Sequence, residues 1–148
     1  MPYFICPNCK ERSIDDDGLE GLTQQAVQCA HCGFGFLFQL LDDYYPAPAT
    51  GFVVCDQDGR VLALGRGVFE LSGFRENDVM GREVMDAFGL SGYEDGKNPA
   101  GLALEWGVRR LDEQLDLTTR AGVRKPVKGD FFPAYDADGG LLVALTPR

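Results

Sequence analysis

The chain of 148 residues is 45% hydrophobic and 25% charged, and its net charge is −9. This composition is typical of a globular protein in water, and the length allows one ordinary domain or a small domain joined to a compact second one. No apolar run approaches the roughly 20 residues that a membrane-spanning helix needs. The start "MPYFICPNCK" also lacks the basic and then apolar segments of a signal peptide, so we expect a cytoplasmic protein without a membrane partner.

Four cysteines lie in two C-x2-C pairs near the N-terminus. Cys6 and Cys9 form the first pair, Cys29 and Cys32 form the second, and 19 residues separate the two pairs. Two tight turns at this spacing can direct four thiolates at one ion, which is the pattern of a tetrahedral structural zinc site. A segment of this size buries too little apolar surface to fold alone, so we expect zinc to supply much of its folding free energy.

Other uses of these thiols remain open at this point. The same four thiolates can hold iron, which would make the segment an electron carrier. Disulfides are disfavoured in the reducing cytoplasm. Thioredoxin-type redox sites have a single C-x2-C motif beside a βαβ pattern, and this sequence has two such motifs and lacks the βαβ pattern. His31 lies between Cys29 and Cys32, and because four thiolates already fill a tetrahedral coordination sphere, we expect His31 to be an exposed loop residue.

The stretch "YFICPNCKERSIDDDGLEGLTQQAVQCAHCGFGF" resembles a family of short bacterial zinc ribbons. In that family a "CPxC" turn leads into a strand, and a "V-x-C-x-x-C-G" turn ends in aromatic residues. The residues that carry the resemblance are Cys6, Pro7, Cys9, Val27, Cys29, Cys32, Gly33 and Phe36. The resemblance covers about the first 40 residues and implies a structural metal without specifying a binding target.

The charge of this segment argues against nucleic acid as its partner. Residues 1–45 contain two basic residues, Lys10 and Arg12, and seven acidic ones. Phosphate binding depends on lysine and arginine, which release the counterions condensed on the polyanion. The acidic run Asp15–Asp17 therefore predicts either a solvated loop or a contact with a basic patch on a protein partner.

The stretch "LLDDYYPAPATG" at residues 40–51 marks a predicted boundary between two domains. Pro46 and Pro48 disfavour helix and central strand and make this linker semi-rigid. Phe34, Phe36, Phe38, Leu40 and Tyr44 lie on one row of period two, which predicts a strand that closes the ribbon. The aromatic face of this strand is expected to fill the core of the ribbon or to dock the ribbon onto the second domain.

The remaining chain predicts two strands, several short helices and three more strands. "GFVVCDQDGRVLALG" reads as a hairpin with its turn at Asp58-Gly59. "RGVFELSGF" is predicted to be a short helix that ends at Gly73, and "RENDVMGREVMDAFGL" supplies further helical turns. In "KNPAGLALEWGVRRL", Asn98 is predicted to cap a helix that Pro99 opens. "EQLDLTT", "VRKPVKGDFFPAY" and "LLVALT" then form an antiparallel meander.

This order of elements resembles the PAS fold. The residues that carry the likeness are "D-x-D-G-R-V" at 56–61, "L-S-G-F" at 71–74, "V-M-G-R" at 79–82 and the closing "P-A-Y-D-A-D-G-G-L-L-V". The family usually has asparagine after the second strand, where this chain has Gly65 or Gly67. The resemblance covers nearly all of residues 51–146 and implies a sensor or protein-interaction domain. The fold alone does not indicate which ligand such a domain binds.

The residues narrow the choice of ligand in the PAS-like domain. A haem of the usual type needs a histidine on the long helix, and the single histidine of this chain is His31. A flavin photosensor needs an "NCRFLQ"-like helix, which the sequence lacks. Cys55 is expected to be a small buried residue, with a reactive or haem-ligating thiol as the alternative. Leu102 and Trp106 share one helix face, and Trp106 is expected to point inward, as core or as a pocket wall.

We therefore expect an α+β protein with a zinc ribbon at residues 1–41, a proline-rich linker at 42–50 and a PAS-like domain at 51–148. Zinc at Cys6, Cys9, Cys29 and Cys32 is structural, and Cys55, Leu102 and Trp106 are the candidates for contact with an unidentified small molecule. No phosphate-binding loop, complete calcium loop or catalytic triad is present, so we expect no enzyme activity. The expected role is signalling through a protein partner, with homodimerisation through the PAS-like sheet. The alternative is a transcription regulator whose ribbon contacts nucleic acid or RNA polymerase.

Overall fold

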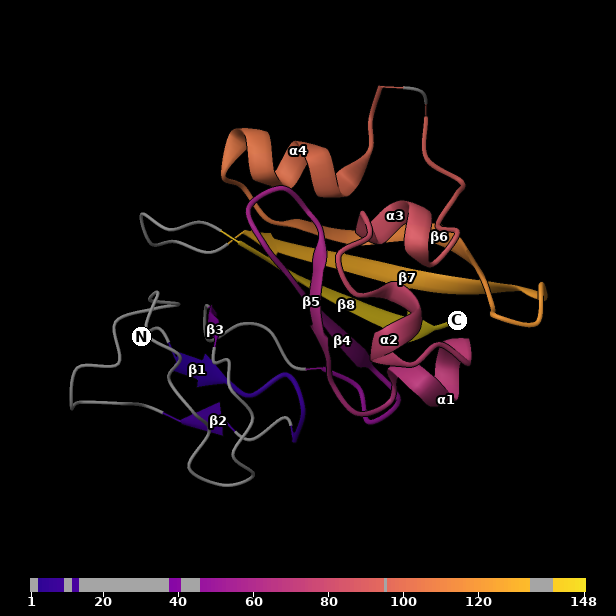
Figure 1. Ribbon diagram of the computed structural model, residues 1–148. Helices are drawn as coiled ribbons and strands as arrows, with labels where there is room; N and C mark the ends of the chain where they lie inside the picture. The colour runs from indigo at the N-terminus through magenta and orange to yellow at the C-terminus, as the bar shows by residue number, and fades with distance from the viewer. Residues whose placement is uncertain (1–2, 10–11, 14–37, 41–45, 95, 134–139) are drawn as a thin grey trace.

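The computed structural model of the chain describes residues 3–9, 12–13, 38–40, 46–94, 96–133 and 140–148. Within these residues the strands form two antiparallel sheets, which contain three and five strands (Figure 1). The smaller sheet belongs to the N-terminal segment and the larger one to the chain from Gly51 onward. No helix among the described residues is both long and apolar enough to cross a lipid bilayer.

The smaller sheet has the strand order β2-β1-β3. Its central strand β1 (Tyr3–Ile5) pairs with β2 (Arg12–Ser13) on one side and with β3 (Phe38–Leu40) on the other. The predicted aromatic strand is therefore present over Phe38–Leu40, and the rest of its row, Phe34, Phe36 and Tyr44, lies outside the described residues.

The larger sheet has the order β5-β4-β8-β7-β6, and each described pair of neighbours is antiparallel. The two strands, the short helices and the meander all appear in the expected order. Their bounds are β4 Gly51–Cys55, β5 Val61–Leu64, α1 Val68–Ser72, α2 Glu76–Val79, α3 Val84–Ala87, α4 Pro99–Trp106, β6 Arg110–Thr118, β7 Arg124–Pro133 and β8 Leu141–Pro147.

The turn of the β4–β5 hairpin is stabilised by hydrogen bonds between its own residues. The carboxylate of Asp56 accepts hydrogen bonds from the backbone N–H groups of Asp58, at 2.8 Å, and Arg60, at 2.9 Å. Gly59 has a φ of 76°, which glycine adopts without steric cost. Turns often contain an aspartate whose side chain accepts a hydrogen bond from the backbone two residues further on, together with a glycine. The turn predicted at Asp58-Gly59 is confirmed.

Two of the helices between β5 and β6 are bounded by capping residues that the sequence predicted. Helix α1 ends at Gly73, whose φ is 77° and whose N–H donates to the carbonyl of Phe69. The side chain of Asn98 accepts hydrogen bonds from the N–H groups of Ala100 and Gly101, at 3.0 and 3.2 Å, and Pro99 is the first residue of α4. Both predicted caps are therefore confirmed.

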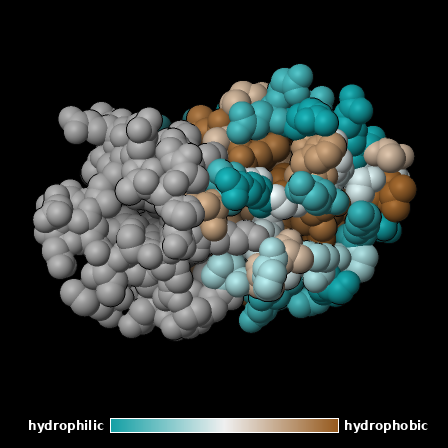
Figure 2. All heavy atoms as spheres, turned by 90° about the horizontal axis from the view of Figure 1, so that it is seen from below, coloured by the Kyte–Doolittle hydropathy of each residue, from teal (hydrophilic) through white to brown (hydrophobic). Residues whose placement is uncertain are grey.

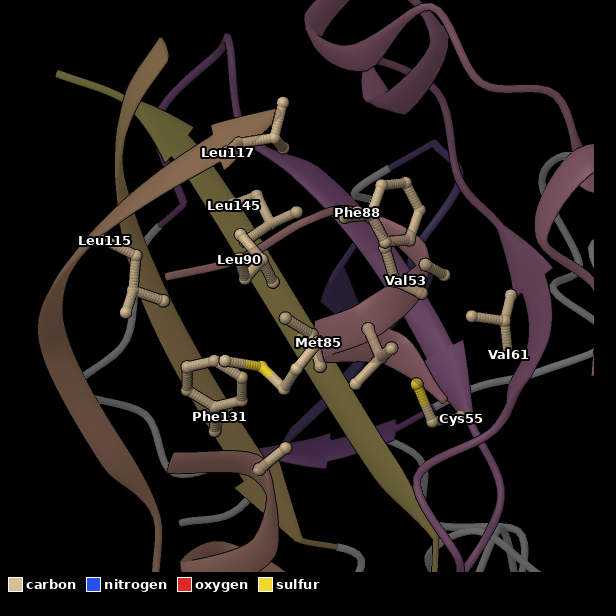
Figure 3. Packing of buried hydrophobic residues seen from close by; sticks show 14 of the residues in the cluster. Val53, Cys55, Val61, Met85, Phe88, Leu90, Leu115, Leu117, Phe131 and Leu145 are labelled. Atoms are coloured by element: carbon tan, nitrogen blue, oxygen red, sulfur yellow. The ribbon is translucent and has the colours of Figure 1, made fainter. Parts of the chain in front are cut away.

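The helices pack on one face of the larger sheet and close a hydrophobic core. Helix α4 contacts β6, β7 and β8, α1 contacts β4, and α2 contacts β5. Figure 3 shows side chains of the sheet, among them Val53, Phe131 and Leu145, directed toward Met85 and Phe88 from the helical segment. Because side chains alternate along a strand, this core accounts for every second residue of the central strands.

The opposite face of the same sheet is buried as well. Five apolar residues of the central strands point away from the helix-side core and are 0–1% exposed; they are Phe52, Val54, Phe132, Leu142 and Ala144. We call them the outer-face residues. Each alternates with a residue of the helix-side core, so the four helices do not cover them. The sheet centre is therefore buried on both sides within a single chain.

Candidate functional site

The first cysteine pair lies in a turn that directly follows β1. Cys6 is 0% exposed, Pro7 is buried, and Cys9 is half-buried. The backbone N–H of Cys9 donates a hydrogen bond to Sγ of Cys6, at 3.5 Å. An N–H directed at a sulfur stabilises the thiolate form, which is the form that ligates metals.

This geometry fits half of the predicted zinc site. A tight turn brings two thiols two residues apart to one side of the chain, as a tetrahedral site requires. Cys29 and Cys32 lie outside the described residues, as do His31 and Gly33. The described part of the chain therefore holds only two of the four predicted ligands, and within it no group of three or more metal-binding side chains comes together.

The Cys6–Cys9 turn contacts the loop between β5 and α1. We define the β5–α1 loop as Gly65–Gly67. The side-chain oxygen of Asn8 accepts a hydrogen bond from the backbone N–H of Arg66, at 3.0 Å. Gly65 is buried, and its backbone lies close to the backbone of Pro7. Sequence reasoning gave no sign of this contact, which joins residues 58 positions apart.

A pocket of about 610 Å³ opens beside this contact. Its walls come from the Cys6–Cys9 turn, from the chain that enters β4, from α1 and from the ends of β7 and β8. The lining residues are Asn8, Cys9, Pro48, Ala49, Arg66, Gly67, Glu70, Leu71, Lys125 and Pro147. Most of the lining residues are apolar, and Arg66, Glu70 and Lys125 are the charged ones.

Cys55 lies in the interior of the larger sheet domain. Its side chain is 0% exposed and belongs to the hydrophobic core with Val53, Val61 and Met85 (Figure 3). Burial raises the pKa of the Cys55 thiol well above its ordinary value, and the nearby carboxylates of Asp56 and Glu83 raise this pKa further. The thiol therefore stays protonated, and it has the environment of a structural cysteine.

Large side chains between the sheet and the helices belong to the same hydrophobic core as Cys55. Phe88 and Phe131 are 0% exposed, Leu115 is 1% exposed and Met85 is 3% exposed. A Cβ atom added at Gly129 would lie 2.9 Å from the Phe131 ring and 3.0 Å from Leu115. Native packing of this density leaves little room for change without a shift of neighbouring atoms.

The predicted inward orientation of Trp106 is wrong. Trp106 is 69% exposed, and Leu102 is half-buried. The residues of α4 that are buried against the sheet include the small Ala100 and Ala103, at 1% and 0% exposed, and the half-buried Leu104 packs against the same core. Small side chains let the helix approach the strands closely, and this turns Trp106, the last residue of the helix, toward solvent. A role of Leu102, Trp106 or Cys55 in ligand binding stays a prediction.

A second pocket, of about 510 Å³, lies between α1, α2 and the β6–β7 turn. The guanidinium of Arg75 lies 4.3 Å from the centre of the Phe69 ring, which is 44% exposed. Nε of Arg120 lies 3.4 Å from a carboxylate oxygen of Asp78. Sequence reasoning missed this site, since its residues come from three separate segments. Figure 2 shows hydrophobic and hydrophilic residues interspersed on the coloured part of the face seen from below.

Solved structures of known proteins share the fold of the larger sheet domain. The PAS domain of nitrogen regulation protein NR(II) from Vibrio parahaemolyticus matches with a TM-score of 0.56 and 12% identity, over 68% of this chain and 91% of that one. The PAS domain of a protein from Colwellia psychrerythraea matches with a TM-score of 0.52 and 16% identity, over 66% and 86% of the two chains. Residues 51–147 have a PAS-like fold.

The predicted fold of this domain is thereby confirmed. A fungal LOV domain photoreceptor is also similar, with a TM-score of 0.58 and 14% identity over 74% of this chain and 82% of that one. No family model and no curated protein matches the sequence. At these identities the comparisons establish the PAS-like fold, and ligand and partner have to be argued from the residues of this chain.

Proposed function

We propose that this protein is a small regulatory protein in which a structural zinc ion, held by Cys6, Cys9, Cys29 and Cys32, organises a ribbon beside a PAS-like domain. The observation that carries the proposal is the Cys6–Cys9 turn, with its N–H···S hydrogen bond, seated against the PAS-like domain. The proposed division is a ribbon at 1–41, a linker at 42–50 and the PAS-like domain at 51–148.

The proposed output is a contact with another protein. We propose no catalytic role, and we place the protein in the cytoplasm, where thiols stay reduced and available to zinc. A basic protein surface is the partner that the acidic ribbon would attract, since opposite charges steer encounter. A ligand or partner that binds one conformation of the PAS-like domain more tightly would shift the population toward it.

We propose further that the PAS-like domain does not carry the photochemistry of the LOV proteins whose fold it shares. Cys55 is the single cysteine between residues 51 and 148. It lies on strand β4 inside the packed core, where burial raises the pKa of its thiol and suppresses the nucleophilic thiolate. A small molecule sensed by this domain would therefore be bound without a bond to this sulfur.

Metal content and visible absorption of the purified, reduced full chain test the proposal together. We expect one zinc per chain and no visible absorption band. One iron with a visible thiolate-to-iron band would instead establish the electron-carrier alternative. A chain that binds neither metal, or that releases zinc without any change in its circular dichroism spectrum, would contradict a structural zinc ribbon.

A further inference from the structure

The contact between the Cys6–Cys9 turn and the β5–α1 loop is a closely packed interface. A Cβ atom added at Gly65 would lie 2.0 Å from the carbonyl oxygen of Pro7 and 2.8 Å from its carbonyl carbon. The φ of Gly65 lies outside the left-handed region, so the backbone conformation alone does not demand glycine there. The residue at position 65 is therefore restricted by the approach of Pro7.

The polar contact at this interface reinforces the steric one. The side chain of Asn8, in the middle of the turn, accepts the N–H of Arg66 at 3.0 Å. Pro7 and Gly65 are both buried beside it. The bond itself lies at the solvent-exposed edge of the interface, so we expect it to contribute only as much as an ordinary neutral hydrogen bond does.

On the PAS-like side, the β5–α1 loop is tied to both the sheet and the helices. The N–H of Gly65 donates to the carbonyl of Phe52 in β4, at 2.9 Å. The N–H of Leu64 donates to the carboxylate of Glu76 in α2, at 3.2 Å. Gly67 is the N-cap of α1, and its carbonyl accepts the N–H of Leu71 at 3.0 Å. A shift of the loop would therefore move the start of α1.

On the ribbon side, the same turn carries the two thiols. Its conformation is held by the hydrogen bond from the N–H of Cys9 to Cys6 Sγ, and a metal bound to both sulfurs would fix it further. The lining of the 610 Å³ pocket includes both Cys9 of this turn and Leu71 of α1. The turn thus links the position of the sulfurs to the position of the β5–α1 loop.

We propose that the Cys6–Cys9 turn and the β5–α1 loop form an intramolecular docking interface that couples metal binding at the cysteines to the conformation of α1 in the PAS-like domain. This inference rests on the proposed zinc site. Coupling between two sites is reciprocal. If zinc strengthens docking by a given factor, docking strengthens zinc binding by the same factor, so loss of docking lowers the zinc affinity by up to that factor.

The test compares Gly65→Ala with Gly101→Ala in the full-length zinc-loaded chain. The added methyl group at position 65 meets the Pro7 carbonyl, whereas at position 101 its nearest neighbours are 3.9 Å away and the backbone is helical. Zinc affinity is measured by competition with a chromophoric chelator. We expect Gly65→Ala to lower the affinity about tenfold, within the usual range of coupling between sites, and Gly101→Ala to leave it unchanged.

Hydrogen exchange of the α1 amides supplies the second readout. In the unmodified chain and in Gly101→Ala, removal of zinc is expected to accelerate exchange at Leu71 and Gly73, and Gly65→Ala is expected to abolish this response to zinc. Asn8→Ala, which removes one hydrogen bond and adds no atoms, is expected to weaken zinc binding about threefold. It keeps the test decisive if Gly65→Ala fails to fold.

The outcomes separate this inference from the proposed function. If the unmodified chain binds zinc, and Gly65→Ala and Asn8→Ala bind it equally well, the coupling is wrong and the zinc site stands. If zinc binds and exchange in α1 is the same with and without it, the coupling is likewise overturned. If the unmodified chain binds no zinc, the proposed zinc site fails and the coupling fails with it.

Discussion

Cys55 illustrates how the environment of one residue decides its chemistry. Its thiol is enclosed between the sheet and the helices, and loss of water around it is the largest cause of its raised pKa, followed by the charges of Asp56 and Glu83. A thiol that does not ionise neither attacks electrophiles nor ligates metal. The sequence interpretation as a small buried residue agrees with this burial, and the four other cysteines remain the candidates for metal chemistry.

The pH dependence of folding should report this shift. The unfolded thiol ionises from about its ordinary pKa of 9.0 upward, whereas the folded thiol stays protonated. Above that pH the unfolded state binds fewer protons than the folded one, so the stabilisation is complete below pH 9.0 and is lost as pH rises above it. Relative to Cys55→Ala, we expect the free energy of unfolding to fall by about 1.4 kcal/mol per pH unit above that point.

Urea titrations of both proteins between pH 7 and pH 10.5 measure this difference. The comparison cancels the titration of lysines, tyrosines and the N-terminal cysteines, which both proteins share. The loss of the sulfur also changes packing, but that change does not vary with pH. If the free energies of unfolding of the two proteins, plotted against pH, stay parallel over the whole range, the raised pKa of Cys55 is contradicted.

At the scale of single elements, the sequence predicted those features that neighbouring residues determine. The Asp56 turn, the Gly73 cap and the Asn98 cap each depend on hydrogen bonds between residues no more than four positions apart. Such contacts form in every fold that places the element there, so pattern and propensity suffice. The positions of the hairpin, the short helices and the meander could therefore be predicted from the sequence alone.

Orientation and docking could not be predicted in the same way. Trp106 was expected inside because it shares a helix face with Leu102, but the residues of α4 that are buried against the sheet include Ala100 and Ala103. The contact of Asn8 with Arg66 depends on how two segments far apart in sequence meet. The sequence clue was a glycine, Gly65 or Gly67, at the position where the PAS family usually has asparagine, and the close approach of Pro7 to Gly65 could not be read from it.

The Asn98 cap gives a quantitative test at this scale. Its side chain satisfies two N–H groups that have no partner within α4, so Asn98→Ala is expected to lower the free energy of unfolding by about 1 kcal/mol. Asn77→Ala is the matched control, because Asn77 is exposed within α2 and alanine favours helix there. Chemical denaturation of the two variants measures both effects, and an equal loss in the two would argue against the cap as the cause.

At the scale of the whole molecule, the buried outer face of the PAS-like sheet constrains how the protein assembles. The outer-face residues Phe52, Phe132 and Leu142 are 0–1% exposed in a single chain, and the helices pack on the other face. Homodimerisation through this face, which the sequence analysis expects, would first require the face to be uncovered. We expect β1 and the Cys6–Cys9 turn to contribute to this cover, because the turn already contacts Gly65 and Arg66.

Removal of zinc from the full chain should then uncover the sheet. If the metal supplies the folding free energy of the ribbon, a chelator will release this cover and expose the five outer-face residues. An exposed contiguous apolar face of this kind binds hydrophobic dyes and favours self-association. We therefore expect chelation to raise the fluorescence of an added hydrophobic dye and to convert monomer to dimer in sedimentation velocity runs.

Addition of zinc in excess over the chelator should reverse both changes, and magnesium at the same concentration should not, because thiolates select the softer ion. Leu142→Ser is the control for the surface involved, since a hydroxyl at the centre of the outer face weakens apolar association without touching the cysteines. If the chelated protein stays monomeric and binds no dye, the cover does not depend on metal. If it dimerises equally well with serine at position 142, the dimer forms through another surface.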